Sequence, residues 1–166
     1  MAGVSNRHLV WAMAAVFIAA SCQPAAQKKA DPNVAKFAAA RSIVRDLLRD
    51  PRSAQFQRER VGKKGAVCGQ VNAKNTYGGY VGFADYVYDP ETKAAHVRPE
   101  EPDYNLEGEY ITSPAAKEHI HSIIASCEFK MRWMALCESN VPPDWKEMEK
   151  ICRQFIELGP VVDALH

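Results

Sequence analysis

The sequence lacks the motifs that would place it in a common functional class. It has no Gly-x-Ser-x-Gly nucleophile motif, no phosphate-binding glycine loop and no His-Glu-x-x-His zinc helix. Its cysteines do not form the two close pairs typical of a zinc site. Lysine and arginine number 21 against 20 aspartate and glutamate, so no excess of charge favours nucleic acid or an anionic lipid surface. The sequence therefore predicts no metal, no cofactor, no nucleic-acid partner and no enzyme of these types.

A long apolar run is also missing. The apolar run from Leu9 to Ala20 would span about 18 Å as a helix, well short of the roughly 30 Å hydrocarbon core of a membrane. It follows a short polar segment with Arg7 and His8 and ends in small residues. This is the anatomy of a signal peptide, which we predict for residues 1–21.

The residues Ala19-Ala20-Ser21-Cys22 resemble the bacterial lipobox, although leucine is commoner than alanine at the first position. The resemblance implies cleavage before Cys22, diacylglycerol on its sulfur and acylation of its new amine, which together anchor a chain firmly to a membrane. Gln23 is not the aspartate that usually signals inner-membrane retention, so we expect the outer membrane, facing the periplasm. Small and polar residues after Cys22 predict a flexible tether, so residues 22–30 form the lipidated cysteine and tether.

The first segment after the tether has the apolar period of an amphipathic helix. Asp31 is a capping residue and Pro32 suits the first helical position. Pro51 disfavours helix at Asp50, so the helix should end near there. The predicted apolar stripe is Val34, Phe37, Ala40, Val44, Leu47 and Leu48.

Two further helices are predicted in the C-terminal part. Ser113-Pro114 starts the first by the same logic, and Val141-Pro142-Pro143 breaks it. Asp144 with Glu147 resembles a capping box that starts the second, and Gly159-Pro160 predicts its end. The short connection between them indicates a helical hairpin.

Between these helical segments the sequence is typical of short strands joined by tight turns. The predicted strands are Ala54–Val61, Ala66–Ala73, Tyr80–Tyr88 and, as a fourth, Ala95–Arg98. Such short connections favour a three- or four-stranded antiparallel meander. The predicted fold class is therefore α+β: residues 31–166 form a single domain in which an N-terminal helix and a C-terminal helical hairpin cover one face of a small antiparallel sheet.

If Cys22 carries lipid, four cysteines remain, and an even number in an exported chain predicts two disulfides. Cys127 and Cys137 lie about 15 Å apart on one predicted helix, beyond the roughly 7 Å limit between bonded Cα atoms. Two pairings remain. In a hairpin that turns near Val141, Cys152 lies closer to the level of Cys127 than to that of Cys137. This favours Cys127–Cys152 across the hairpin and Cys68–Cys137 between sheet and helix.

The most distinctive residues are Asp50 to Phe56 (DPRSAQF), Cys68 to Asn75 (CGQVNAKN) and Gly78 to Phe83 (GGYVGF). They resemble a family of small exported bacterial proteins, some of them lipoproteins, that share patterns close to DPxSAxF, CGxVNAKN and GGYxGF. The resemblance implies fold and export, without an activity. Family members tend to end in a Trp–Cys segment, to which Trp133 and Cys137 correspond, and this supports the pairing of Cys68 with Cys137. The chain departs from the family by continuing past Cys137.

The second and third of these motifs have a structural and a functional interpretation. Turn chemistry explains the glycines and asparagines, and we weight this interpretation about two to one. The alternative is a recognition surface on the hairpin, because loops carry function disproportionately. Its candidate residues are Asn72, Lys74, Asn75, Tyr77 and Tyr80.

Other polar residues give weaker indications. His119 and His121 are two positions apart on a helix and therefore point to different faces, which argues against a metal site. His96 could meet Asp85 across the sheet as an ordinary surface contact. The acidic residues Glu100, Glu101 and Asp103 fit a solvated loop better than a cation site.

The sequence leads to a non-catalytic expectation: a lipid-anchored accessory protein that binds an envelope protein in the periplasm through protein–protein contacts, for example an inhibitor or immunity-type protein. An envelope hydrolase with an unrecognised active site is the rival, and a purely structural envelope component is the third option. A cleft with convergent acidic or histidine side chains would favour the hydrolase. An exposed apolar patch around Tyr77 and Tyr80 would favour binding. The identity of the partner and the oligomeric state stay open.

Overall fold

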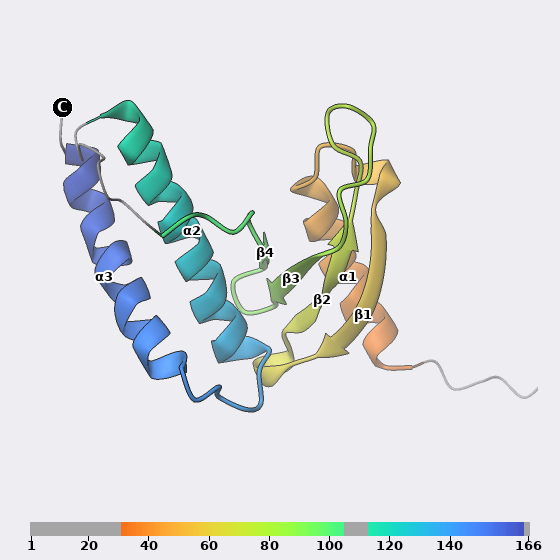
Figure 1. The fold of residues 1–166 in the computed structure, drawn as a ribbon. Coiled ribbons are helices and arrows are strands. Elements are labelled where there is room, and N and C mark those ends of the chain that lie inside the picture. Colours follow the sequence, from red (N-terminus) through yellow and green to blue (C-terminus); the bar gives the residue numbers. More distant parts are fainter. Residues whose placement is uncertain (1–30, 105–112, 165–166) are drawn as a thin grey trace, which may run out of the picture. The chain divides into compact units, whose positions relative to one another are not determined.

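The computed structural model describes residues 31–104 and 113–164, with one helix before a sheet and two helices after it (Figure 1). The signal peptide, Cys22 and the tether expected in residues 1–30 lie outside these residues. The 3-10 helices Pro51–Ser53 and Lys63–Gly65 flank the first strand. The main elements are α1 (Asn33–Asp46), β1 (Gln55–Val61), β2 (Val67–Asn72), β3 (Ala84–Asp89), β4 (Ala94–Val97), α2 (Pro114–Leu136) and α3 (Trp145–Ala164).

The four strands form one antiparallel sheet in the order β1-β2-β3-β4, which confirms the predicted meander and the α+β fold class. The central pair aligns Cys68 with Val87 and Gly69 with Tyr86. Between β1 and β2 the register shifts after Gln57, where Arg58 takes a positive φ of 52°. This irregularity is a β-bulge, which no pattern in the sequence indicated.

The helices begin at or next to the predicted residues: α1 begins at Asn33, one residue after Pro32, α2 begins at Pro114, and α3 begins at Trp145, directly after Asp144. Asp31 Oδ1 accepts a hydrogen bond of 2.9 Å from the backbone nitrogen of Asn33. Ser113 Oγ accepts one of 3.1 Å from the backbone nitrogen of Ala116, and Pro114 is the first residue of α2. In both cases a side-chain oxygen binds a backbone donor that the helix itself leaves unpaired.

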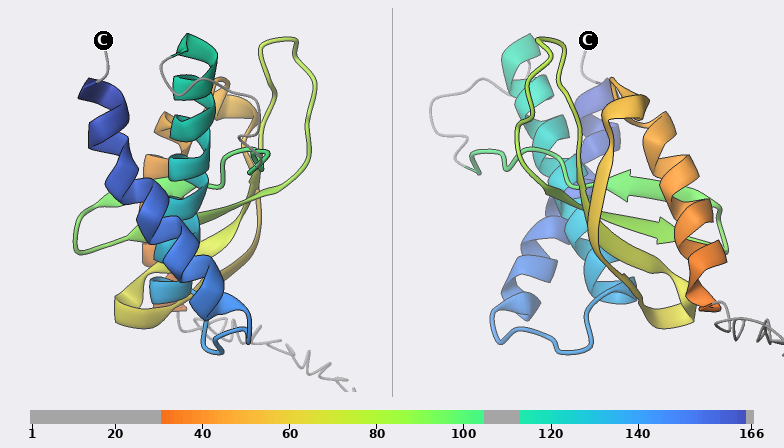
Figure 2. Two further views of the ribbon diagram at one scale, coloured as in Figure 1. Left: turned by 60° about the vertical axis from the view of Figure 1, so that its left-hand side comes forward. Right: turned by 90° about the vertical axis from the view of Figure 1, so that its right-hand side faces the viewer.

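The helices lie on opposite faces of the sheet, so the prediction that they cover one face is wrong (Figure 2). On one face, α1 packs through Ala40 and Val44 against Val67, Tyr86 and other residues of the sheet. On the other, α2 packs through Phe129 and Leu136. The physical reason is that β2 and β3 are buried on both sides, and successive side chains of a strand point to opposite faces. On the face of β2 and β3 that α2 covers, the buried side chains are Cys68 and Val87, with Ala66 beside them.

Helix α3 contacts α2 and extends beyond its predicted end. Gly159 is buried, and a Cβ atom added to it would come within 3.1 Å of the side chain of Ile124 in α2. Val162 is fully buried two residues after Pro160. Helix continues through Pro160 to Ala164, so the expected end at Gly159-Pro160 is wrong, and burial of Val162 offsets the cost of a proline inside the helix.

One disulfide joins α2 to the sheet and a second joins α2 to α3. Cys68–Cys137 joins β2 to the end of α2 across 69 residues, with 5.8 Å between Cα atoms. Cys127–Cys152 joins α2 to α3 across 25 residues, with 5.0 Å between Cα atoms. Both bonds are those that the sequence favoured, and all four cysteines are buried.

Candidate recognition surface

The segment 73–83 between β2 and β3, called here the 73–83 loop, projects from one end of the sheet (Figure 1). Lys74 and Tyr80 face each other across its base in an isolated antiparallel bridge. Ser53 fastens this base from outside: its Oγ accepts a 2.9 Å hydrogen bond from the Lys74 backbone nitrogen, and its carbonyl accepts one of 3.1 Å from Tyr80 Oη. The base of the loop is therefore tied to the 3-10 helix Pro51–Ser53.

Asn75 folds the tip of the loop. Its backbone nitrogen donates to the Gly79 carbonyl at 2.9 Å, and its carbonyl accepts from the Gly78 nitrogen at 3.0 Å. Its Oδ1 accepts two more hydrogen bonds, from the backbone nitrogens of Tyr77 at 2.9 Å and Gly79 at 3.1 Å. Gly78 has a φ of 79°, which favours glycine. The Asn75 side chain is thus used within the turn, as the structural interpretation expected.

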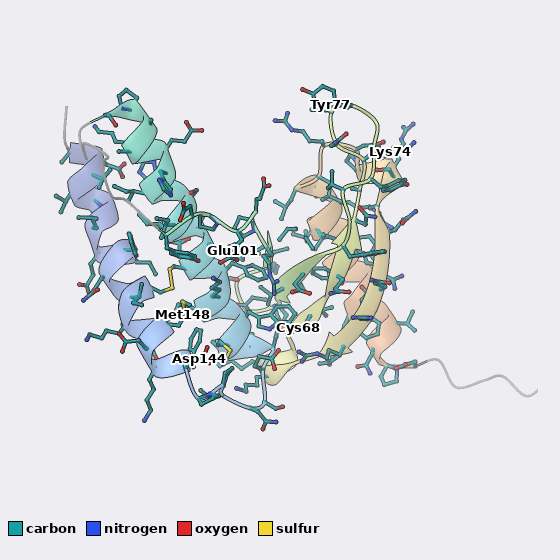
Figure 3. The ribbon with its side chains drawn as sticks, in the orientation of Figure 1. Cys68, Lys74, Tyr77, Glu101, Asp144 and Met148 are labelled. Carbon is teal, nitrogen blue, oxygen red and sulfur yellow. A yellow bond between two sulfur atoms is a disulfide. The ribbon has the colours of Figure 1, made fainter. Side chains whose placement is uncertain are left out.

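Four large apolar side chains of the loop are exposed to solvent. Tyr77 at the tip is 95% exposed (Figure 3), Val81 76%, Tyr80 45% and Phe83 42%. The Lys74 ammonium lies 5.8 Å from the centre of the Tyr80 ring. Single exposed apolar residues are ordinary on a protein surface, whereas several within one short loop mark an interaction site.

The sequence-based candidates therefore divide into two groups. Lys74, Tyr77 and Tyr80 come together on the loop surface. Asn72 does not belong to this surface: it ends β2, is only 8% exposed, and its buried Oδ1 has no hydrogen-bond partner within the residues described. Asn75 supports the loop from within.

Sequence reasoning missed Val81 and Phe83 because it placed them in a strand from Tyr80 to Tyr88. That strand begins only at Ala84, and Gly82 before it has a φ of 108°. Such a backbone conformation interrupts the alternation of a strand. The glycine within GGYVGF was the available signal that the apolar residues before Ala84 leave the sheet.

Shallow hollows lie on both sides of the segment from Val81 to Ala84. One, of about 250 Å³, has an apolar floor that includes Leu47 at the end of α1, with Arg49 and Lys74 among its lining. The other, of about 430 Å³, is lined by Phe83 and Glu100 among others. Arg98, which also lines this second hollow, forms an ion pair with Asp85 in β3.

The structure also corrects one expected polar contact. His96 pairs with Val87 in the sheet, and Asp85 instead bonds to Arg98 and to Gln70 Nε2, so the expected contact between His96 and Asp85 is wrong. His119 and His121 point apart as expected: the His121 ring lies 2.9 Å from Asp163, whereas His119 contacts the Asp103 carbonyl. Among residues 31–104 and 113–164, no three His, Cys, Asp or Glu side chains are placed to hold a metal ion.

One cluster contains residue types found in catalytic sites. Tyr104 Oη lies 3.2 Å from Ser126 Oγ and accepts a 2.7 Å hydrogen bond from Lys130 Nζ, which also binds Glu101. Burial lowers the pKa of Lys130, but the hydrogen bonds to Glu101 and Tyr104 outweigh it and raise the pKa overall. Lys130 is therefore protonated and cannot act as a base, and Ser126 is only 1% exposed. The cluster fastens the segment before α2 to that helix.

His96 should make the free energy of unfolding depend on pH. Burial lowers its pKa, and the positive charge of Arg132 lowers it further, against the carboxylates of Glu128 and Asp89. The unfolded chain, with a His pKa of about 6.5, then binds the proton more readily than the folded chain. Stability should be highest above about pH 6.5 and fall as the pH drops below that value. Urea unfolding between pH 7.5 and 5 should show a smaller decline in the His96→Gln variant, and an unchanged decline would contradict this assignment.

Comparisons of the chain with models of protein families, with curated proteins and with solved structures found no match. No helix in the described part of the chain is long and apolar enough to cross a membrane. The assignment of function therefore depends on the residues of the site themselves.

Proposed function

We propose that this protein is a lipid-anchored binding protein that faces the periplasm, attached to the outer membrane through Cys22, and that its 73–83 loop contacts a protein partner of the envelope. The observation that carries the proposal is the gathering of exposed Tyr77, Tyr80, Val81 and Phe83 on a loop whose base is fastened by Ser53. Aromatic side chains supply much of the energy of protein interfaces, and a fixed loop loses little conformational entropy on binding.

The rival function, an envelope hydrolase, has less support from the described residues. Its strongest candidate is the cluster of Ser126, Tyr104 and Lys130, in which the hydroxyl of the serine is closed to substrate and the lysine is protonated. Binding through an exposed apolar loop needs neither a cleft nor an activated nucleophile.

The proposal predicts that polar substitutions on the loop strongly reduce capture of the partner. We expect Tyr77→Ser combined with Val81→Ser to reduce the amount of cross-linked partner at least about tenfold. Both side chains should become buried in the complex, and their loss should weaken the free energy of binding by more than about 1.4 kcal/mol. The measurement is cross-linking in cells that make the full-length chain, followed by purification and quantitative mass spectrometry.

A matched control is available outside the loop. Val141 and Val161 are 63% and 55% exposed, and Val141→Ser combined with Val161→Ser likewise replaces two exposed large apolar side chains by serine. This control should recover the partner at the wild-type level. Equal recovery by the loop variant and the control would refute the role of the loop, and absence of any reproducible partner would refute the binding function.

A further inference from the structure

The edge of the sheet at β4 carries backbone groups that point away from the rest of the sheet. The Arg98 nitrogen donates a 2.7 Å hydrogen bond to the Asp85 carbonyl, so these two residues form a hydrogen-bonded pair. Such pairs alternate along an antiparallel ladder. Ala95 and Val97 occupy the intervening positions, opposite Tyr88 and Tyr86. Their N–H and C=O groups therefore point outward, and they find no hydrogen-bond partner within the described parts of the chain.

A hollow of about 370 Å³ runs along this edge, and we call it the β4 groove. It is bounded by the end of α1 on one side and by α2 on the other. The groove continues toward the 73–83 loop, because it shares Leu47 and Val97 with the hollow of about 250 Å³ beside Val81. The residues that line it come from these elements and from the segment after β4: Leu47, Ala95, His96, Val97, Pro99, Ala125, Glu128, Phe129 and Arg132.

We infer that the β4 groove binds an extended segment of the partner polypeptide as an added strand. This inference rests on the proposed function and specifies its mode of binding. The outward groups of Ala95 and Val97 offer a donor and an acceptor at every second residue, a spacing that an extended peptide backbone matches and a lipid chain does not. Alternate side chains of the added strand meet Leu47 on the α1 side and Phe129 on the α2 side. The contact at Leu47 is apolar, whereas Phe129, which is only 3% exposed, lines the groove together with Glu128 and Arg132, so the segment is apolar at the positions that face Leu47.

The end of the added strand nearest Val97 comes next to the loop. Val81 lines the hollow that shares Leu47 and Val97 with the groove, and Val81 is 76% exposed. One partner can therefore contact the loop with its surface while its extended segment occupies the groove. The neighbouring cations Arg49 and Lys74 line the same hollow without a carboxylate, which favours a segment with an acidic residue at this end.

Val97→Pro tests the inference with little disturbance of the sheet. The Val97 nitrogen points outward, so proline removes one donor to the added strand and no hydrogen bond of the sheet. Val97→Ala is the control, since it trims the side chain and keeps the N–H group. Circular dichroism and thermal unfolding of both variants verify that they fold.

The probes are linear twelve-residue peptides, selected from a random phage-displayed library on the full-length chain in detergent micelles. We expect the selected peptides to bind the Val97→Ala variant within about threefold of wild type and the Val97→Pro variant at least about tenfold more weakly. Peptides that carry N-methyl groups on alternate backbone nitrogens are also tested for binding to the wild-type chain, and this measurement does not depend on the folding of a variant. One alternate set should abolish binding, and the other should leave it within about threefold.

Several outcomes would overturn the inference. They are a failure to select any peptide, equal binding to the two Val97 variants, and equal loss from both methylated sets. A wild-type chain that forms dimers, lost in Val97→Pro, would assign the edge to a second copy of this chain instead. If the partner captured in cells is lost by the loop variant but kept by Val97→Pro, the added strand is refuted while the binding function stands. If the loop variant keeps the partner, the proposed role of the loop fails, and if no partner is captured at all, the proposed binding function fails.

Discussion

Replacing Cys68 and Cys137 together by alanine should lower the free energy of unfolding by about 4 kcal/mol. The bond closes a segment of 69 residues between β2 and the end of α2, and the chain-entropy relation assigns about 4.4 kcal/mol to a loop of that length. Both cysteines also pack with Val87, Phe129 and Leu136 between α2 and the sheet. Urea unfolding of the oxidised wild type and of the double variant gives the difference directly.

The second disulfide is the internal control for this prediction. Cys127–Cys152 closes only 25 residues, and the same relation assigns it about 3.5 kcal/mol. Since α3 packs on α2 rather than on the sheet, loss of the Cys127–Cys152 disulfide should destabilise α3 locally. Amide hydrogen exchange should become fast in α3 of the variant without Cys127 and Cys152, while amides of β2 and β3 stay protected. The prediction is contradicted if loss of either bond opens the sheet to the same extent.

The disulfide pairing was predictable from the sequence because it depends on distances along helices. A regular rise per residue excluded Cys127–Cys137 and placed Cys152 near Cys127 in any tight hairpin. The helix starts were predictable for a similar reason, since the Ser113-Pro114 signal acts on the backbone groups next to it. Features set by local geometry can be derived from single residues and their spacing.

The placement of helices on both faces of the sheet could not be predicted from the alternation of apolar and polar residues along the strands alone. In β2, Val67 and Val71 point to α1 and Cys68 points to the other side, and both sets are buried. A strand that is apolar on both faces needs a cover on both faces. The covering element for each face follows from tertiary packing, which no local pattern encodes. The same holds for Val162, whose burial keeps α3 helical after Pro160.

The candidate surface was predictable in outline but not in composition. The turn residues around Asn75 marked a loop, and Tyr77 and Tyr80 were found from their type. Leu47 was expected on the apolar stripe of the first helix, yet it lies just after α1 and is 55% exposed. Its position beside Val81 in one hollow arises because the end of α1 and the 73–83 loop meet at the same end of the sheet. That meeting requires the three-dimensional fold.

The second large effect is expected at Glu59, which joins α1 to the sheet. Its carboxylate accepts hydrogen bonds from the Arg41 guanidinium and from Tyr86 Oη, and its side chain is only 6% exposed. Gly69 makes room for this contact, since an added Cβ atom would come within 2.9 Å of both the Glu59 and Tyr86 side chains. The bulge at Arg58 sets the position of Glu59 in the strand. Burial and the bond to Glu59 raise the pKa of Tyr86, so its hydroxyl stays neutral and donates at physiological pH.

Glu59→Ala should therefore lower the free energy of unfolding by about 3 kcal/mol, because it leaves the buried Tyr86 hydroxyl without an acceptor and breaks a partly buried ion pair. Arg41 is 41% exposed, so in the variant its guanidinium can form hydrogen bonds with water. The loss of stability is therefore smaller than if two buried polar groups were left without partners. Tyr86→Phe, which leaves Glu59 bound to Arg41, should cost only about 1 kcal/mol. Gln57→Ala in the same strand removes a 3.0 Å bond to Gln70 on the opposite face and serves as the control. If Glu59→Ala were no more damaging than Gln57→Ala in urea unfolding, this network would not be what fixes α1 on the sheet.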